Sequence, residues 1–350
     1  MTNTDVPEAA SFTDTDGAMV PDGIPASARA ATQTPAPSAT RHDAAGITAV
    51  VVTYNPEPGL LTELCRLTRP QVEHIELVDN GSCPEALAAI EALCTDGIRL
   101  TALGRNLGIG AAQNAGIARA RKRGADYVLL LDHDSLPAPD MVARLRAAIE
   151  NQPPDSAPVG AAGPRYADER QTTSPSPFVR LEGFRRIRCE CAHENDQIEV
   201  EHLIASGSLI PMAVLNRVGD MDEALFIDYV DIEWCLRASH AGHRMLGICD
   251  ARMQHQLGET PIRFLGKHLP DHSPIRHYYL FRNALLLQRM PHIPLRWKLV
   301  DGWQTVMKFG FYALVATPRW PRIRMMARGL LDGLRGRGGA FQRADDSQPR

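Results

Sequence analysis

Residues 126–134 read Asp-Tyr-Val-Leu-Leu-Leu-Asp-His-Asp, an apolar run that passes directly into two carboxylates, Asp132 and Asp134. A short continuous apolar run is typical of a strand that is buried on both faces of a parallel sheet. Open α/β folds bind ligands at the carboxyl edge of such a sheet, which is where the two carboxylates would lie. Carboxylate oxygens at this spacing suit Mg²⁺ or Mn²⁺, which usually also hold substrate phosphates. An Asx turn after the strand is the alternative, because Asp caps turns and helices freely.

The region before this stretch alternates between apolar runs and helical patterns. Runs of strand length occupy residues 47–52, 75–78 and 98–103, and helical patterns lie between them and again before residue 126. Pro56 ends the first run and starts a turn. Strands that alternate with helices form parallel βαβ units, so the sequence predicts an α/β fold with a mostly parallel sheet.

Polar residues of the kind that bind ligands follow the predicted strands. They occupy residues 53–55, 79–82 and 104–108, which read Thr-Tyr-Asn, Asp-Asn-Gly-Ser and Gly-Arg-Asn-Leu-Gly. Loops are polar in any protein, but these three segments would share one sheet edge with Asp132. A carboxylate there can accept a base N–H, and a glycine-rich turn lets backbone and a helix N-terminus approach phosphate. The segments therefore predict a nucleotide pocket with a metal at its mouth, although Gly108-x-Gly110 is not the dinucleotide fingerprint.

Charge is distributed unevenly along this chain of 350 residues, whose formal net charge is only −3. Residues 1–46 contain six acids, two arginines and almost no large apolar side chains. Such a segment buries too little surface to offset the entropy lost on ordering, so we expect a disordered N-terminal tail. Residues 276–343 contain thirteen Lys or Arg and two acids, which favours an anionic partner, either a membrane surface or nucleic acid.

The seven cysteines are odd in number and irregular in spacing. Cys189-x-Cys191 has no second pair at the spacing of a zinc site. The N-terminus shows no basic segment followed by an apolar stretch of the kind that directs secretion. We therefore expect reduced thiols in a cytoplasmic protein.

Four motifs together resemble those of family 2 glycosyltransferases of the GT-A fold, and within that family the bacterial rhamnosyltransferases that use dTDP-L-rhamnose. The motifs are Ala49-Val-Val-Val-Thr-Tyr-Asn55, Val78-Asp-Asn-Gly-Ser82, Asn106-Leu-Gly108 with Asn114-x-Gly116, and Leu131-Asp-His-Asp-Ser135. The resemblance extends from about residue 47 to about residue 290. It implies a Rossmann-like sheet flanked by helices, with a helical appendage at the C-terminus. His133 stands where many of these sequences have Gln, but the middle residue of this motif points away from the metal.

The resemblance also implies which residues bind the donor and the metal. Predicted contacts to a nucleotide-sugar are Thr53, Tyr54, Asn55, Asp79, Asn80, Asn106, Gly108, Asn114 and Asp132. Predicted ligands of Mg²⁺ or Mn²⁺ are Asp132, Asp134 and His255, the last at the spacing at which this family places a metal-binding His. Ser206-Gly207-Ser208 interrupts a strand-like run at residues 203–210 and would lie on the acceptor side, because glycine permits close approach of a ligand.

A second acidic motif, Asp228-Tyr-Val-Asp231-Ile-Glu233-Trp234, lies at the start of a predicted helix. Asp231 falls at the position of the family's catalytic base, while Val230 and Glu233 replace its usual Glu and Asp. Asp228 is a second candidate for the base, and Glu233 and Trp234 would face the acceptor. An acidic first turn that complements the helix dipole is the structural alternative.

These assignments imply a metal-dependent, inverting sugar transfer. Asp231 would take the proton of the acceptor hydroxyl, which attacks the anomeric carbon of the donor. A divalent cation would neutralise the charge that develops on the departing nucleoside diphosphate, so that one protein base suffices.

The C-terminal region predicts helices that do not span a membrane. Residues 276–283 also resemble the rhamnosyltransferases, and Arg282 would either pair with pyrophosphate or lie on an exposed helix face. Residues 295–335 mix aromatic with basic side chains, which suits the interface of an anionic membrane, although two core-packing helices are the alternative. Asp301 and Lys308 argue against a bilayer span.

We therefore predict a tail at residues 1–46, a glycosyltransferase domain at 47–275 and a basic, amphipathic helical region at 276–340. The domain would comprise a nucleotide-binding half, 47–135, and an acceptor half, 136–275. The expected acceptor is a cell-surface or lipid-linked glycan, and no nucleic acid is expected. The protein is expected to be cytoplasmic and peripheral on the inner face of the bacterial cytoplasmic membrane. Two alternatives stay open: a sugar-nucleotide nucleotidyltransferase, which would have a basic, Gly-rich loop after the first strand, and a non-catalytic protein that binds membranes or nucleic acid.

Overall fold

The computed structural model describes residues 44–167, 178–255, 262–264, 267–269, 273–315 and 317–342. The chain divides after Ala36, and every described residue belongs to the second unit, Pro37–Arg350. The tail predicted at residues 1–46 therefore lies, except for its last three residues, outside the described residues.

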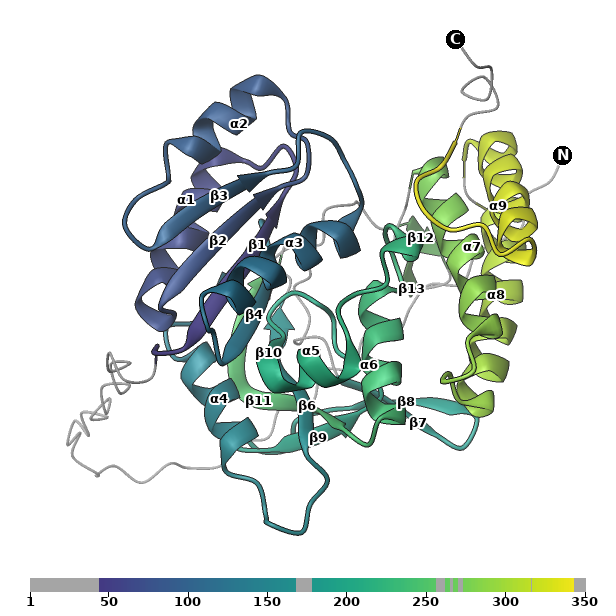
Figure 1. Cartoon of the computed structure of the whole chain (residues 1–350). Helices are drawn as coiled ribbons and strands as arrows, with labels where there is room; N and C mark the ends of the chain where they lie inside the picture. Colours follow the sequence, from purple (N-terminus) through teal and green to yellow (C-terminus); the bar gives the residue numbers. More distant parts are fainter. Residues whose placement is uncertain are drawn as a thin grey trace, which may run out of the picture. The chain divides into compact units, whose positions relative to one another are not determined.

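The first half of the second unit is the predicted parallel sheet, drawn in purple and blue in Figure 1. Its strands are β1 (Ile47–Thr53), β2 (His74–Asp79), β3 (Ile98–Ala102) and β4 (Tyr127–Asp132). They pair in parallel in the order β3-β2-β1-β4. The helices between them are α1 (Pro58–Thr68), α2 (Pro84–Glu91) and α3 (Ile109–Lys122). Proline opens α1 and α2, where its missing N–H breaks no helical hydrogen bond.

The sheet continues beyond β4 in the order β10-β6-β11-β5 and becomes mixed there. These strands are β10 (Leu209–Pro211), β6 (Val159–Ala167), β11 (Arg244–His255) and β5 (Ser135–Pro137), and β9 (Gln197–Val200) also pairs with β11. β10 is antiparallel to both of its neighbours, so β6 and β11 again run in the direction of β4. The α/β fold expected from the sequence is therefore confirmed, and antiparallel pairing enters only after β4.

Helices cover both faces of the sheet because successive side chains of a strand point to opposite faces. Val50 and Val52 pack in one hydrophobic cluster with α3, α5 (Met212–Val218) and α6 (Val230–His240). Ala49 and Val51 pack in another with α1 and α4 (Met141–Glu150). Strands buried on both faces read as unbroken apolar runs, which is why β1 and β4 are the clearest elements of the sequence.

Two strand predictions in the acceptor half are wrong. Residues 152–200 are rich in Pro, Arg and polar residues, a composition that predicts an irregular insertion with a hairpin. They do contain the hairpin of β7 (Phe178–Glu182) and β8 (Arg185–Cys189), but also the central strand β6. The sequence of β6 is rich in Gly and Ala and has few of the large apolar residues that indicate a strand. Gly163 is needed for close packing, because a Cβ there would lie 2.8 Å from the Leu203 side chain. Residues 203–208, expected to be extended, form a turn that precedes the short strand β10.

The expectation that all cysteines are reduced thiols is also wrong. Cys191, between β8 and β9, forms a disulfide with Cys249 of β11. The other five cysteines are free. The two partners are 58 residues apart in sequence, and irregular spacing alone does not indicate such a pair.

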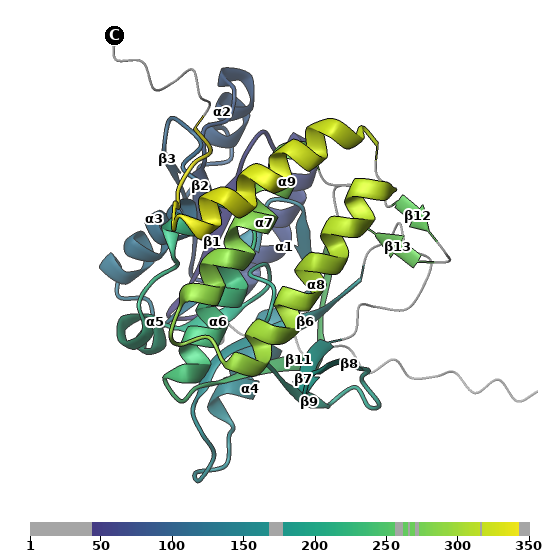
Figure 2. The ribbon, with the colours of Figure 1, turned by 90° about the vertical axis from the view of Figure 1, so that its right-hand side faces the viewer.

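Three helices follow the sheet: α7 (Pro274–Arg289), α8 (Leu295–Leu314) and α9 (Arg319–Leu334). Figure 2 shows α8 and α9 as the outermost elements on the side that faces the viewer. Glycines in α9 allow close packing on α7, since a Cβ at Gly329 would lie 2.3 Å from the carbonyl oxygen of Tyr278. No helix among the described residues combines the length and the apolar character that crossing a bilayer requires.

Candidate active site

The two carboxylates of the opening stretch lie where the sequence predicts, at the carboxyl end of β4. Asp132 is the last residue of β4, and Ser135 opens β5. β11 pairs with β5 so that the backbone of His255 lies opposite Ser135, one residue beyond Asp134. The three predicted metal ligands therefore come from two adjacent backbone segments. The side chain of His255 lies outside the described part of the structure.

A buried serine supports this turn. The Ser206 hydroxyl accepts a hydrogen bond of 3.0 Å from the backbone N–H of Asp132 and makes another of 2.7 Å with the Ser135 hydroxyl. Gly207 adopts φ +86°, and a Cβ there would lie 2.5 Å from the ring of Pro164. The Ser208 hydroxyl donates to the carbonyl of Ile204 at 2.6 Å. Both serines are buried and hold the turn through these hydrogen bonds, and their predicted place on the acceptor side stays a prediction.

The chemistry of the donor set suits a hard divalent cation. Asp132 and Asp134 are half-buried and can offer carboxylate oxygens, which Mg²⁺ and Mn²⁺ prefer. Among the described side chains, no group of three His, Cys, Asp or Glu residues is arranged to hold a metal ion. His255 would have to complete such a group, and its backbone position next to Ser135 is compatible with that.

Asp231 lies close to this turn although it comes from a distant segment. It stands in the first turn of α6, half-buried, and lines a small cavity with Ala205, Ser208 and Trp234. Burial raises the pKa of its carboxyl to about 6, and the negative charges of Asp228 and Asp132 raise the pKa further, against a hydrogen bond from the Ile232 backbone N–H that lowers it. A buried carboxyl with a pKa near neutrality is poised for proton transfer.

The loop that leads into α6 has a strained backbone. Phe226, Asp228 and Tyr229 have φ angles of 66°, 62° and 66°. Residues with a Cβ rarely adopt positive φ, and each instance costs about 1–3 kcal/mol. Such strain persists only where surrounding contacts impose it, and it clusters at functional sites.

The predicted nucleotide segments are ordered by their own side chains. The Asp79 carboxylate is buried and accepts hydrogen bonds from the backbone N–H groups of Gly81 and Ser82 and from the hydroxyls of Ser82 and Thr53. The Asn55 side chain accepts from the backbone N–H of Cys83 at 2.8 Å. Tyr54 is exposed beside them. The polar residues at the ends of β1 and β2 thus form one connected turn.

A second amide network links the end of β2 to the start of α3. Asn80 donates to Asn106 at 3.2 Å and accepts from the backbone N–H of Leu107 at 2.8 Å. The Asn106 side chain also accepts from the backbone N–H of Gly108. Gly108 has φ +92°, and a Cβ there would lie 2.5 Å from the carbonyl oxygen of Phe226. The glycine therefore lets the start of α3 touch the strained loop before Asp231.

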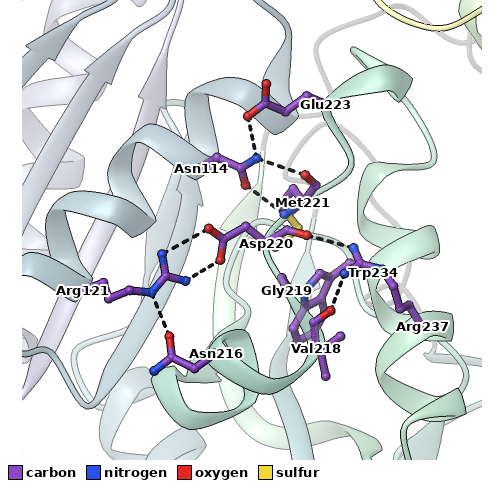
Figure 3. A network of polar contacts seen from close by, with 10 residues as sticks. All are labelled: Asn114, Arg121, Asn216, Val218, Gly219, Asp220, Met221, Glu223, Trp234 and Arg237. Carbon is purple, nitrogen blue, oxygen red and sulfur yellow. Dashed lines mark hydrogen bonds and ion pairs between the residues drawn. The ribbon is translucent and has the colours of Figure 1, made fainter.

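The structure corrects two predicted donor contacts. Asn114 uses its whole amide within the protein, because it makes two hydrogen bonds with the backbone of Met221 and one with Glu223 (Figure 3). Arg282 is fully buried and donates to the backbone carbonyls of Ala224, Leu225 and Gly339. Neither side chain is available to a diphosphate in this arrangement.

Two predicted acceptor contacts are also corrected. Glu233 is buried and pairs with Arg237, at 2.8 Å, and with the ring of His292, at 2.9 Å. Trp234 is buried and donates its ring N–H to the carbonyl of Gly219 at 2.9 Å (Figure 3). Both side chains anchor α6, and Trp234 also lines the small cavity beside Asp231.

The sequence did not point to the partners of the strained loop. Arg276 pairs with Asp228 at 3.1 Å, and the Tyr229 hydroxyl donates to the buried carboxylate of Asp301 in α8 at 3.1 Å. Asn283 of α7 donates to three carbonyls of this segment. Asp301 is the one acid of α8, and a carboxylate that is buried in a helix needs a polar partner. This was the one feature of the sequence that could have indicated a contact between α8 and another segment.

The comparisons with known proteins agree with this geometry. Residues 48–213 match the family model "Glycosyl transferase family 2". The chain is 34% identical over 297 residues to the dTDP-rhamnosyl transferase RfbF of Shigella flexneri, across 83% of this chain and 96% of that protein. It is 26% identical over 279 residues to an N-acetylglucosaminyl-diphospho-decaprenol L-rhamnosyltransferase of Mycobacterium tuberculosis, across 71% and 88%.

Solved structures show the same fold. TarS 1-349 of S. aureus, in complex with UDP-GlcNAc, matches with a TM-score of 0.55 and 17% identity, over 83% of this chain and 81% of that one. GalNAc-T7, solved with UDP, GalNAc and Mn²⁺, matches with a TM-score of 0.50 and 15% identity, over 78% and 58%. The nucleotidyltransferase alternative has no support in these matches. By its family model and its close relative, the chain is an enzyme of glycosyltransferase family 2 with the GT-A fold.

Proposed function

We propose that the protein transfers L-rhamnose from dTDP-L-rhamnose to a hydroxyl of a lipid-linked or cell-surface glycan, with inversion and with a divalent cation. The donor rests on the 34% identity to a dTDP-rhamnosyl transferase over 96% of that relative. The reaction rests on one observation of the structure. Asp231, at the start of α6, lines a small cavity with Leu130 of β4, two residues before Asp132, which supports a site shared by the proposed base and the predicted metal turn.

Asp231 is the proposed base. Its carboxylate would take the proton of the acceptor hydroxyl as the oxygen attacks the anomeric carbon. Partial burial and two negative neighbours favour the protonated form and so make this carboxylate a stronger base than an exposed one. Asp228, which pairs with Arg276 at 3.1 Å, is the second candidate for this role.

The turn at the end of β4 is the proposed metal site. Asp134 and His255, with Asp132, would hold Mg²⁺ or Mn²⁺, which when bound offsets the negative charge of the leaving diphosphate. The Ser206 hydroxyl holds this turn through its hydrogen bonds with the Asp132 backbone N–H and the Ser135 hydroxyl. Asp79, Thr53 and Asn55 would order the pocket for the nucleoside, and contact of Asp79 with the base remains a prediction.

A donor screen tests the proposal. The full chain is incubated with Mn²⁺ and dTDP-L-rhamnose, UDP-galactofuranose, UDP-GlcNAc or a GDP-sugar, and release of the nucleoside diphosphate is followed. We expect hydrolysis of dTDP-L-rhamnose to exceed that of the others by about tenfold or more, a difference of about 1.4 kcal/mol in transition-state binding. Faster turnover of UDP-galactofuranose would contradict the proposed donor, since a galactofuranosyltransferase is also a relative, at 29% identity.

The pH dependence of turnover should report Asp231. The base works only when it is deprotonated, so kcat should rise with pH through about 6, the raised pKa of this carboxyl, and level off above it. An unperturbed Asp would place this rise near pH 4. A pH profile of donor hydrolysis at saturating metal measures the difference, and a rise centred near pH 4 would argue against the burial described here.

We further propose that the C-terminal helices bind the inner face of an anionic bacterial membrane, so that the enzyme is cytoplasmic and peripheral. The exposed large apolar side chains of α8 are Leu295, Leu299, Trp303, Val306, Met307 and Leu314. Their spacing of three and four residues places most of them on one helix face. Asp301 and Asp332, the acids of the described part of this region, are both buried, whereas Arg296, Arg319 and Arg324 are exposed. An apolar face bordered by cations fits an anionic interface.

Cosedimentation with vesicles tests this surface. Leu299→Ser with Trp303→Ser removes two side chains that are 54% and 66% exposed. We expect binding to phosphatidylglycerol-containing vesicles to weaken by about tenfold or more, since burying one such side chain contributes about 1.5–3 kcal/mol. Neutral phosphatidylcholine vesicles serve as the control, and hydrolysis of soluble donor should be unchanged. Equal binding of variant and wild type to both vesicles would contradict the proposed membrane surface.

A further inference from the structure

The segment between α5 and α6, residues 219–229, delivers Asp231 to the site and is held from several sides. Its first part is fixed by α3 and α6, as Figure 3 shows. Asn114 makes paired hydrogen bonds with the backbone of Met221, at 2.8 and 3.0 Å, and Arg121 pairs with the Asp220 carboxylate. Arg237 donates to the carbonyl of Asp220 from the other side, at 2.9 Å. The start of the segment is therefore clamped between the two helices.

The second part of the segment contains the strained backbone, and two of its side chains are held by the C-terminal helices. Arg276 of α7 pairs with Asp228 at 3.1 Å, and the Tyr229 hydroxyl donates to Asp301 of α8 at 3.1 Å. Phe226, Asp228 and Tyr229 have positive φ angles within four residues of one another. The first N–H of α3, on Ile109, donates to the carbonyl of Phe226 at 2.6 Å. An unsupported loop of this kind would relax to ordinary φ values, and Asp231, two residues after Tyr229, would move with it.

Asn283 of α7 holds the backbone of this loop, because its two side-chain N–H groups are shared among three of the loop's carbonyl oxygens. Its side-chain NH₂ lies 2.9, 2.8 and 2.9 Å from the carbonyl oxygens of Leu225, Ile227 and Asp228. Its side-chain oxygen accepts from the guanidinium of Arg282 at 2.9 Å. Asn283 is fully buried, so it meets no substrate and acts only on the loop.

Arg282 extends the same clamp toward the start of the loop. Its guanidinium donates to the carbonyl of Leu225 at 2.8 Å and to that of Ala224 at 3.1 Å. Carbonyl oxygens that point together into one buried amide cannot be satisfied by water, so the pair of side chains and this loop conformation require each other.

We propose that Asn283, oriented by Arg282, is a positioning residue that holds the left-handed loop at residues 226–229 so that Asp231 is aimed at the acceptor oxygen. The inference rests on the proposed role of Asp231 as the base. It assigns a catalytic purpose to a buried amide 52 residues away in sequence. It also explains why Arg282 and Asn283 occur together: the arginine fixes which side of the amide faces the loop.

Steady-state hydrolysis of dTDP-L-rhamnose with Mn²⁺ by the full-length Asn283→Ala variant tests this role. Loss of the three hydrogen bonds should let the loop relax and misplace Asp231, so we expect kcat to fall by about 100-fold. The buried Asn283 side chain does not touch the donor, so KM should stay within about threefold of wild type. The rise in Tm on addition of dTDP should stay within about a degree or two of the wild-type rise. Asn283→Ser, which keeps one hydroxyl donor, should give an intermediate kcat and serves as the test variant if the alanine variant does not fold.

Gln152→Ala is the matched control. The Gln152 amide also ties elements together, since it bonds the Ala148 carbonyl and the side chains of Gln197 and Arg244. These contacts lie near Arg244 at the start of β11. They are therefore at the amino ends of the parallel strands, whereas Asp132 lies at the carboxyl end of β4. We expect this control to lower Tm without changing kcat.

The inference is overturned if Asn283→Ala and Asn283→Ser keep kcat within about threefold of wild type, or if their loss appears only in KM. It is also overturned if Gln152→Ala loses kcat to the same extent. Asp231→Asn is measured in parallel, so that failure of the proposed base can be distinguished from failure of the positioning role of Asn283. Full activity of Asp231→Asn would remove the proposed base, whereas an inactive Asp231→Asn beside a fully active Asn283→Ala would remove only the positioning role.

Discussion

Asp231→Asn is expected to lower kcat for hydrolysis of dTDP-L-rhamnose by about 10³-fold, within the range of about 10²–10⁴ that a general base contributes. Asparagine keeps the size of the side chain and the hydrogen bond from the Ile232 backbone N–H, but it cannot accept a proton. The donor and metal should still bind, so dTDP with Mn²⁺ should still raise Tm as in wild type. Steady-state kinetics and a thermal melt together measure this.

Asp155→Asn is a suitable control for that substitution, because Asp155 is an exposed acid in the turn between α4 and β6. It should leave kcat unchanged. More than a tenth of wild-type kcat in Asp231→Asn would contradict the assignment. Asp228, which pairs with Arg276, would then be the next carboxylate to replace.

Asp134→Asn is expected to be the second most damaging substitution, with a loss of about 10²–10³ in kcat. A cation that stabilises the leaving diphosphate contributes several kcal/mol, and each 1.36 kcal/mol is tenfold in rate. Wild-type activity should disappear with EDTA and return with Mn²⁺ or Mg²⁺. The variant should need far more metal to reach any activity, and Mn²⁺ with dTDP should no longer raise its Tm.

His133→Gln provides the matched control, since it changes the neighbouring side chain of the same turn to a neutral side chain that can still form hydrogen bonds. It should keep its response to metal. Activity of the wild type that survives EDTA, or a metal response that is lost equally in His133→Gln and Asp134→Asn, would remove the proposed metal role.

The fold was predictable from the sequence where a strand is marked by its own apolar residues. β1 and β4 are compact, mostly apolar runs that end in polar residues, whereas Glu76 interrupts β2 and Arg99 and Thr101 interrupt β3. The parallel pairing of this half follows from the alternation of strands with helices. β6 escaped because its sequence, Val-Gly-Ala-Ala-Gly-Pro-Arg-Tyr-Ala, is rich in small residues. Those glycines are needed for close packing against neighbouring side chains such as Leu203, which only the folded sheet reveals.

The sequence predicted which carboxylates belong to the candidate site, but not the hydrogen bonds from distant segments that hold them in place. A motif places Asp132, Asp134 and Asp231 on particular elements, and in the structure Asp231 lines a small cavity with Leu130, two residues before Asp132. A motif cannot tell which polar residues will be consumed inside the protein. Asn114 and Arg282 bond backbone groups 107 and 58 residues away, and such partners depend on how distant segments pack.

The most direct measurement is a crystal structure of the full chain with dTDP and Mn²⁺, with the metal located by its anomalous scattering. We predict one Mn²⁺ at about 2.1 Å from an oxygen of Asp134 and from a nitrogen of His255, bound to the diphosphate, with the Asp231 carboxylate across the same cleft. A metal bound away from the end of β4, or a nucleotide in a cleft that Asp231 does not line, would contradict it.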